Sequence, residues 1–433
     1  MISDSAALMK RSHLSLTLSM ITCLILLINL SFKIIVVEGF IFSATSVLCP
    51  LTAILYTLIL KDCDADQQRH ALNQSFLALY LFSVGIYLLV NLPAAEYMHD
   101  NPAYQIAFED IPKKFFAGTL SFGLSFYLPH VYCCARKKSL LNDPEKRILL
   151  ALLGGFFFFT LDFLLLFSHP AMIRFGQIYW GSLVVSTGIL LCALALFFTC
   201  LRFKKTGNTS INREIGPAYL SVPLYHYLVC TSVTIVLICL ACEYRLIAFS
   251  NGVVLGASGI LFPVTIMASN LIGELFGYKA NFRLALVLIL SELIFDLFIM
   301  GAMALPAPDF FNLNPFYSYI MPRRILASVT ALFVTFVGNA MLLENLKYTK
   351  LGLNWVSRIL IANITVMSLL CLVNYVLLYV GVYPYEQIFN IAFNSWAYKM
   401  LMILVSLPVL LWLNRRVKVQ LESRRPNVIS RLE

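Results

Sequence analysis

The chain has 433 residues, of which 60% are hydrophobic and only 12% are charged, and it carries a net charge of +10 at pH 7. Soluble globular chains carry about 25% charged residues, so this composition excludes a soluble globular protein and predicts an integral membrane protein. Positive charge is typical of the cytoplasmic loops of membrane proteins, so the basic balance requires no nucleic-acid partner.

The apolar runs are long enough for helices that cross a membrane, which need about 20 residues each, and too long for the short alternating strands of a barrel. The first run is too long for the core of a signal peptide and has no convincing cleavage site, so it predicts a retained helix. The fold class predicted is an all-α integral membrane protein with about twelve transmembrane helices, at Leu14–Val37, Ser43–Leu60, Ala71–Leu92, Phe115–Cys134, Ile148–Phe167, Ile178–Leu201, Tyr219–Cys242, Gly252–Leu271, Leu284–Leu305, Ile325–Leu343, Ile359–Val380 and Ile388–Leu413.

The motifs of metal sites and nucleotide hydrolysis are missing from the sequence. Eleven cysteines lie mostly inside apolar runs, and Cys239 and Cys242 have the spacing of a metal-binding pair but lack a second pair. There is no HExxH motif and no GxxxxGK[ST] phosphate loop. The sequence therefore predicts neither a metal nor a cofactor, and no enzyme.

The basic residues determine the expected orientation in the membrane. If the N-terminus is cytoplasmic and there are twelve spans, 24 of the 32 Lys and Arg residues lie on cytoplasmic segments. This excess follows the positive-inside rule. We therefore expect a multi-pass protein of the bacterial inner membrane with both termini in the cytoplasm.

The two halves of the chain repeat one another at an almost constant spacing of 210 to 213 residues. An even number of six spans per copy returns the chain to its starting side, so the copies are expected to be parallel repeats that pair as a pseudo-dimer. The predicted domains are a six-helix repeat at 1–201, a cytoplasmic linker at 202–218, a second six-helix repeat at 219–414 and a basic cytoplasmic tail at 415–433. The matching segments are Cys49–Thr52 with Phe262–Thr265, Leu92–Pro93 with Leu305–Pro306, Asn101–Pro102 with Asn314–Pro315, Lys113–Ala117 with Arg323–Ala327, Arg147–Leu149 with Arg358–Leu360, and Gln177–Tyr179 with Gln387–Phe389.

The stretch Phe262–Arg283, which reads FPVTIMASNLIGELFGYKANFR, is the most informative segment of the second half. It predicts an apolar helix that carries Asn270 and Glu274 on one face, followed by a break at Gly277–Tyr278. These two side chains either belong to a substrate-binding corner or are an interfacial Glu and an Asn satisfied by a neighbouring helix.

Ionisable residues inside the membrane are costly and are therefore candidates for function. Glu292 and Asp296 lie four residues apart in one span, where they either share a proton for coupling or bond a neighbouring helix. Lys399 lies near the centre of the last span beside Trp396, and it needs a carboxylate partner or a ligand.

The first half has apolar or weakly polar residues at most of the corresponding positions. Thr57, Lys61, Leu79, Ser83 and Ile189 stand where the second half has Asn270, Glu274, Glu292, Asp296 and Lys399. One interpretation is that the second half carries the polar residues of the functional site and that the first half is mainly structural. The alternative is a separate, asymmetric site built from Asp162 and Lys33.

The second half, from about Tyr225 to Lys418, resembles the queuosine precursor transporter family, also called vitamin-uptake-transporter-like. The resemblance rests on Phe262–Arg283, on PRRILASVTALFVTFVGNAMLLENLK, on WVSRILIANIT and on AYKMLMILVSLPVLLWLNRR. It implies six helices per subunit, a dimer, and import of deazapurine precursors of queuosine, such as 7-cyano-7-deazaguanine.

The resemblance also implies site residues. Glu274, Gly277, Arg324, Ser328 and Lys399 fit the family pattern, whereas Asn270 and Asn339 stand where the family usually has Asp. The expected substrate-binding residues are Asn270, Glu274, Arg324, Asn339, Lys399, Tyr278 and Trp396, the candidates for coupling are Glu292 and Asp296, and the candidate aromatic walls also include Phe262, Phe276, Trp355 and Tyr398.

Two other functions fit the same pattern of spans. A major-facilitator-type carrier also has twelve helices in parallel halves, although GELFGYKANFR only loosely imitates the loop of that class. A non-transporting, degenerate membrane protein would explain the Asn substitutions and the polar-poor first half. An integral-membrane enzyme has no supporting motif.

Overall fold

The computed structural model describes residues 2–95, 111–135, 144–168, 175–203, 221–243, 245–249, 252–308, 314–348 and 352–422. Within these ranges the chain is almost entirely helical, and ten helices are long and apolar enough to cross a membrane. The protein is therefore an all-α, multi-pass membrane protein, as predicted. A shorter apolar helix at His13–Asn29 and the helical run Ile111–Ala135 complete twelve runs among the described residues.

The chain divides into two compact units, each of which includes a short segment from the other half of the sequence. Unit 1 consists of Met1–Tyr87, Pro102–Ile215 and Phe295–Tyr319. Unit 2 consists of Leu88–Asn101, Gly216–Ile294 and Ile320–Glu433. The predicted linker 202–218 and tail 415–433 lie mostly outside the described residues, but helix α8 includes Arg202 and helix α15 continues to Glu422.

The helices of unit 1 pack around α2, which contacts α1, α7 and α8. Its interior is rich in phenylalanine, with Phe122, Phe126 and Phe158 packed ring against ring. The helical elements of this half are α1 (Ile2–Asn29), α2 (Thr45–Asp62), α3 (Ala65–Val90), α5 (Ile111–Phe122), the π-helix η2 (Gly123–Tyr127), α6 (Leu128–Ala135), α7 (Pro144–Leu166) and α8 (Phe175–Phe203).

The helices of unit 2 pack around α10, which contacts α9, α13 and α15. The helical elements of the second half are α9 (Ser221–Ala241), α10 (Ser258–Phe276), α11 (Tyr278–Ala304), α12 (Asn314–Leu332), the π-helix η5 (Phe333–Val337), α13 (Gly338–Lys347), α14 (Trp355–Tyr379) and α15 (Tyr385–Glu422).

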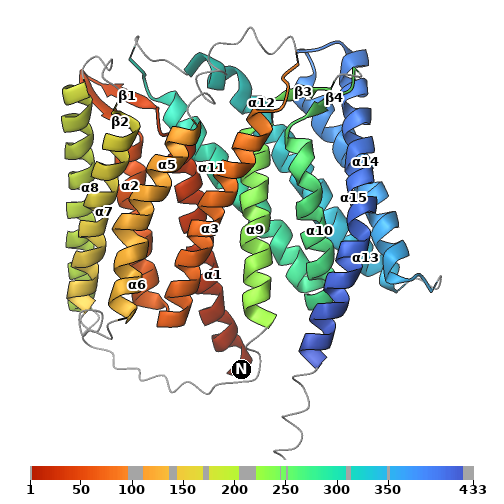
Figure 1. Cartoon of the computed structure of the whole chain (residues 1–433), viewed down its shortest axis with the longest axis horizontal. Coiled ribbons are helices and arrows are strands. Elements are labelled where there is room, and N and C mark those ends of the chain that lie inside the picture. Colours follow the sequence, from red (N-terminus) through yellow and green to blue (C-terminus); the bar gives the residue numbers. More distant parts are fainter. Residues whose placement is uncertain are drawn as a thin grey trace, which may run out of the picture. The chain divides into compact units, whose positions relative to one another are not determined.

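Two short β-hairpins depart from the purely helical prediction (Figure 1). In unit 1, β1 (Ile34–Val37) pairs antiparallel with β2 (Phe40–Ser43), and in unit 2, β3 (Leu246–Ala248) pairs with β4 (Val254–Gly256). The predicted first span Leu14–Val37 is therefore wrong at its end, and the predicted span that starts at Gly252 begins too early. The apolar, β-branched residues of these strands have the hydropathy of a membrane helix, so composition alone could not separate the two states.

Candidate functional site

The predicted break after the helix that carries Asn270 and Glu274 is confirmed. Helix α10 ends at Phe276, Gly277 has φ 84° and ψ 176°, and α11 begins at Tyr278. This backbone region is essentially restricted to glycine, because a Cβ atom would strain it. The turn lets two long helices follow one another directly, and it places Glu274 and Tyr278 on either side of the break.

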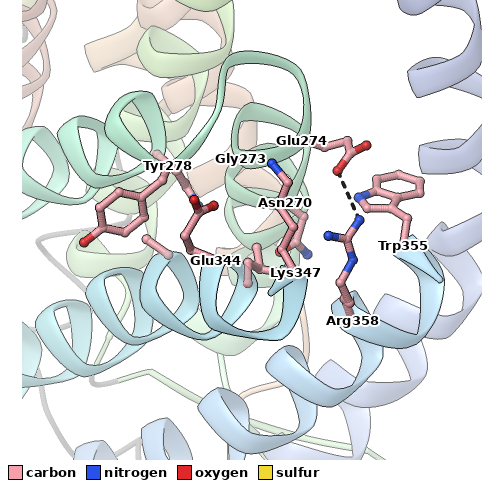
Figure 2. A pocket seen from close by; sticks show the side chains of 11 residues that line it. Asn270, Gly273, Glu274, Tyr278, Glu344, Lys347, Trp355 and Arg358 are labelled. Carbon is pink, nitrogen blue, oxygen red and sulfur yellow. Dashed lines mark ion pairs between the residues drawn. The ribbon is translucent and has the colours of Figure 1, made fainter. Parts of the chain in front are cut away.

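A pocket of unit 2 lies beside this turn, and we call it the Glu274 pocket (Figure 2). It encloses about 380 Å³ of empty space, including the part open to solvent. Glu274 accepts a hydrogen bond from Lys418 Nζ at 2.7 Å, and its other oxygen lies 3.7 Å from a guanidinium nitrogen of Arg358. The carboxylate therefore ties the end of α10 to both α14 and α15. The remaining lining residues include Asn270, Tyr278, Asn281, Glu344, Lys347 and Trp355.

A layer of buried polar side chains, which we call the asparagine layer, includes Asn270 and Asn281 from the lining of this pocket. Asn339 donates to Ser269 Oγ at 3.1 Å and to Asn270 Oδ1 at 3.0 Å. Asn270 in turn donates to Asn363 Oδ1 at 3.3 Å, and Ser269 donates to Asn281 Oδ1 at 2.8 Å. All five side chains are buried, so the hydrogen bonds offset much of the cost of removing these groups from water.

The asparagine layer is not saturated. Within the described part of the chain, Asn339 Oδ1 and Asn363 Nδ2 have no hydrogen-bond partner. One free acceptor and one free donor in a buried layer give it the capacity to bond a polar ligand or water.

Another pocket of unit 2 surrounds Lys399, and we call it the Lys399 pocket. It contains about 390 Å³ of empty space, again including the part open to solvent. The polar residues of its lining include Glu243, Ser258, Ser328 and Asn374, and they lie beside Phe262 and Cys239. Both pockets border α10, the Lys399 pocket at Ser258 and Phe262 and the Glu274 pocket twelve residues further along, which is about 18 Å of helix.

Lys399 is only 3% exposed. Its ammonium lies 5.3 Å from the ring centres of both Phe262 and Tyr375, and 3.6 Å from Cys371 Sγ. Rings attract a cation only modestly. No carboxylate of the described residues lies within 4.0 Å of this nitrogen. The buried ammonium can therefore donate hydrogen bonds to an incoming acceptor.

Glu243 is the pocket residue that sequence reasoning missed. It lies two residues after the end of α9, is buried, and accepts a hydrogen bond from Asn374 Nδ2 at 3.4 Å. The sequence places it immediately after the apolar run that ends at Cys242, where acidic residues usually face water, so no sequence signal indicated its burial. Arg358 and Lys418 were not among the predicted site residues, so their pairing with Glu274 was also missed.

The structure divides the predicted site residues between these neighbourhoods. Asn270, Glu274 and Tyr278 line the Glu274 pocket, Asn339 belongs to the asparagine layer, and Lys399 lines the other pocket. The buried Arg324 borders the Lys399 pocket, because it donates to Leu240 O at 3.4 Å and Leu240 is part of the wall.

Like Asn339 and Arg324, the predicted residues Trp396, Glu292 and Asp296 line neither pocket. Trp396 packs on the outside of a buried cluster and donates to Ser368 Oγ at 3.1 Å. Glu292 and Asp296 are fully buried in α11, at the point where the chain passes from unit 2 to unit 1. No group of three or more His, Cys, Asp or Glu side chains able to hold a metal occurs among the described residues.

Comparison with known proteins supports a transport function. Residues 256–413 match the model of a family described as "putative vitamin uptake transporter". No curated protein and no solved structure matches the chain. The matched segment contains α10 to α15 almost completely, including Phe262, Glu274, Arg358 and Lys399. This match and the membrane-helical fold point to a small-molecule uptake transporter rather than an enzyme.

Proposed function

We propose that this protein imports a planar, purine-like queuosine precursor, such as 7-cyano-7-deazaguanine, across the bacterial inner membrane. The observation that carries the proposal is Lys399, a buried cation of the segment that matches the uptake-transporter family, which lies 5.3 Å from two aromatic ring centres in a mostly apolar pocket with a few polar groups. The finer assignment of the substrate extends the resemblance of Phe262–Arg283 and the last helix to queuosine precursor transporters.

The donors and acceptors of the Lys399 pocket complement a guanine-like ring. Such a ring presents an O6 acceptor beside amino and ring N–H donors. We infer that Lys399 donates to the acceptor and that Glu243 and Asn374 accept from the donors, while Phe262 faces the ring. A ligand that lacks these groups would leave buried partners unpaired, at a cost of about 1–3 kcal/mol each.

In this proposal the Glu274 pocket is a second binding site on the transport path. The asparagine layer lies between it and the Lys399 pocket. A ligand passing along α10 would exchange its bonds to Lys399 for bonds to the free groups of Asn339 and Asn363. The Glu274 ion pairs would open at the far end, which is inexpensive because partly exposed pairs contribute only about 0–1 kcal/mol each. Glu292 and Asp296 remain the candidates for proton coupling.

Uptake of labelled 7-cyano-7-deazaguanine by a bacterial strain that lacks its own importer tests the proposal. Expression of the wild-type chain should restore uptake and the queuosine content of tRNA. Lys399→Ala should reduce uptake at least about tenfold, because a charge-assisted hydrogen bond contributes about 1.5–3 kcal/mol.

The matched control is Lys279→Ala, which removes an exposed lysine of the same unit. If Lys399→Ala is expressed normally and keeps full uptake, the site is wrong. If the wild-type chain takes up another vitamin-like compound in a competition panel but not the precursor, the carrier function stands and the substrate is wrong. No uptake of any compound would favour the non-transporting alternative.

A further inference from the structure

Each compact unit contains a segment from the opposite half of the chain, and in each case it is the segment that follows the third helix of that half. The end of α3 and the residues after it, Leu88–Asn101, belong to unit 2. The end of α11 and the residues after it, Phe295–Tyr319, belong to unit 1. We call the two described parts the first strap, Val90–Ala95, and the second strap, Leu305–Pro308.

The first strap pairs with the edge of the hairpin of unit 2 through one isolated β-bridge. Ala95 N donates to Leu246 O and Ala248 N donates to Pro93 O, both at 3.0 Å, around an antiparallel bridge between Ala94 and Ile247. The guanidinium of Arg245 donates to Leu92 O at 2.7 Å and also to Val90 O. This is pairing of an extended segment with an exposed sheet edge, reinforced by a buried cation.

The second strap makes the corresponding contacts with the hairpin of unit 1. Val36 N donates to Pro306 O at 3.0 Å, and Lys33 Nζ donates to Leu305 O at 3.2 Å. The partners in the two units are related by the spacing of the sequence repeat: 212 residues for Lys33 and Arg245, and 213 for Pro93 and Pro306. At the position of Ala95, the second strap has Pro308, which lacks an N–H and cannot make the second ladder bond.

We propose that the chain is a tandem duplication whose two copies exchange straps reciprocally, so that the first half supplies a structural part of the unit that holds both pockets. The inference rests on contacts within each unit and holds whether or not the substrate proposed above is correct. The exchange assigns a structural role to the first half, which has few polar residues. The first half completes the hairpin edge of unit 2, and the second half does the same for unit 1.

The first strap is connected to the Lys399 pocket by two short routes. Ala95 is 1% exposed and belongs to the same buried cluster as Tyr375 and Cys371, the two residues that lie against the ammonium of Lys399. Arg245, which donates hydrogen bonds to the strap, lies two residues after Glu243. The strap therefore supports the wall of the pocket from outside.

A disulfide tests the exchange in the full-length protein. The bridge between Ala94 and Ile247 is a non-hydrogen-bonded antiparallel pair, whose Cα atoms lie about 4.5 Å apart, within the range of disulfides. Ala94→Cys with Ile247→Cys is combined with a protease site inserted between residues 207 and 208. After oxidation in membranes and cleavage, most of the protein should remain a single species on a non-reducing gel and separate into two fragments on reduction.

Each single cysteine variant serves as the control and should separate without reduction. The reciprocal pair Ile35→Cys with Ala307→Cys should behave like the first double variant. If both double variants are well expressed and neither holds the fragments together, the exchange does not exist.

The support of the pocket has its own readout, which needs no substrate. Cys239 lines the Lys399 pocket and is buried. Arg245→Ala should increase its rate of labelling by N-ethylmaleimide roughly tenfold, because charge-assisted hydrogen bonds are lost. The labelling of Cys23, buried in unit 1, should not change, and neither should Cys239 labelling in the control Arg415→Ala, which removes an exposed arginine.

The disulfide between positions 94 and 247 should restore slow labelling of Cys239 in the Arg245→Ala background. Restoration shows that the strap, rather than the lost arginine itself, protects the pocket. Unchanged labelling in Arg245→Ala, or fast labelling that the disulfide fails to slow, would overturn the supporting role while the gel assay still decides the exchange.

Discussion

At the scale of single residues, Glu274 and Lys399 are satisfied to very different degrees. Glu274 is partly exposed and has two cationic neighbours, so its ion pairs are expected to contribute little to stability. Lys399 is buried against two rings and a thiol, which compensate a charge incompletely. A binding site keeps such a group available for its ligand, whereas a purely structural core would pair it.

The asparagine layer makes a prediction about stability. Asn339→Asp replaces a donor of two hydrogen bonds with a group that only accepts, and it puts an acceptor against Asn270 Oδ1. We expect the unfolding free energy to fall by at least about 2 kcal/mol at neutral pH, measured as thermal unfolding in detergent.

The control for this change is Asn390→Asp on α15. Asn390 is exposed, and its side chain accepts a hydrogen bond from Asn394 that an aspartate can also accept. Equal stability of the Asn339→Asp and Asn390→Asp variants would mean that Asn339 does not act as the donor that holds the layer together.

Lys33 gives a pH-dependent prediction. It lies after the end of α1, and burial lowers its pKa to about 8 from 10.5. Below pH 8 the folded state bears the full cost of the charged amine, and between pH 8 and 10.5 the unfolded state binds more protons, so this cost is relieved as the pH rises. The melting temperature of the wild type should therefore increase relative to Lys33→Met between pH 7.5 and pH 10.

The exposed Lys61 at the end of α2 provides the comparison, since Lys61→Met should track the wild type at both pH values. A melting-temperature difference between wild type and Lys33→Met that is constant with pH would show that the amine of Lys33 titrates no differently in the folded protein.

At the scale of elements, the hairpins show where hydropathy stops being informative. Ile34–Val37 continues the apolar pattern of α1, yet it forms a strand whose two-residue turn has positive φ at both Glu38 and Gly39. Positive φ at both central residues is typical of the type I′ turn of tight hairpins. The second strap satisfies one edge N–H group of this strand, because Pro306 O accepts a hydrogen bond from Val36 N.

The two long helices α10 and α11 depend on a single glycine. Gly277 has φ 84° and ψ 176° with open space where a Cβ would lie, so Gly277→Ala should cost about 1–3 kcal/mol through backbone strain alone. Gly301→Ala, inside α11 and also facing open space, should instead stabilise the protein by about 0.4–1 kcal/mol.

Thermal unfolding of these two variants measures the difference directly, and each serves as the control for the other. Their stabilities should move in opposite directions. A Gly277→Ala variant as stable as the wild type would show that the break between the helices does not need the glycine conformation.

At the scale of the whole molecule, the membrane orientation is the prediction that the structure leaves to experiment. Twelve helical runs and the excess of Lys and Arg on one set of loops predict that both termini are cytoplasmic. A fluorescent protein fused to the C-terminus should therefore fluoresce, and alkaline phosphatase fused there should be inactive. The opposite result for both reporters would reverse the orientation of the protein in the membrane, and with it the proposed direction of passage from the Lys399 pocket to the Glu274 pocket.

The sequence by itself determined the class of the protein, the approximate positions of its spans, the break at Gly277 and the resemblance of the second half to uptake transporters. These properties are local, because the length of an apolar run, the φ of a glycine and a continuous motif can each be recognised within about 25 residues. The helix-face argument also correctly placed Asn270 and Glu274 close together along one pocket.

Only the tertiary structure decided which distant residues meet. Arg245 and Leu92 lie 153 residues apart in the chain, and Lys418 and Glu274 lie 144 apart. Such pairings depend on how helices and straps pack, which no local pattern encodes. Burial of Glu243 and the separation of Lys399 from Glu274 into two pockets have the same origin, because a polar residue near the end of a span faces water or the interior according to the elements that cover it.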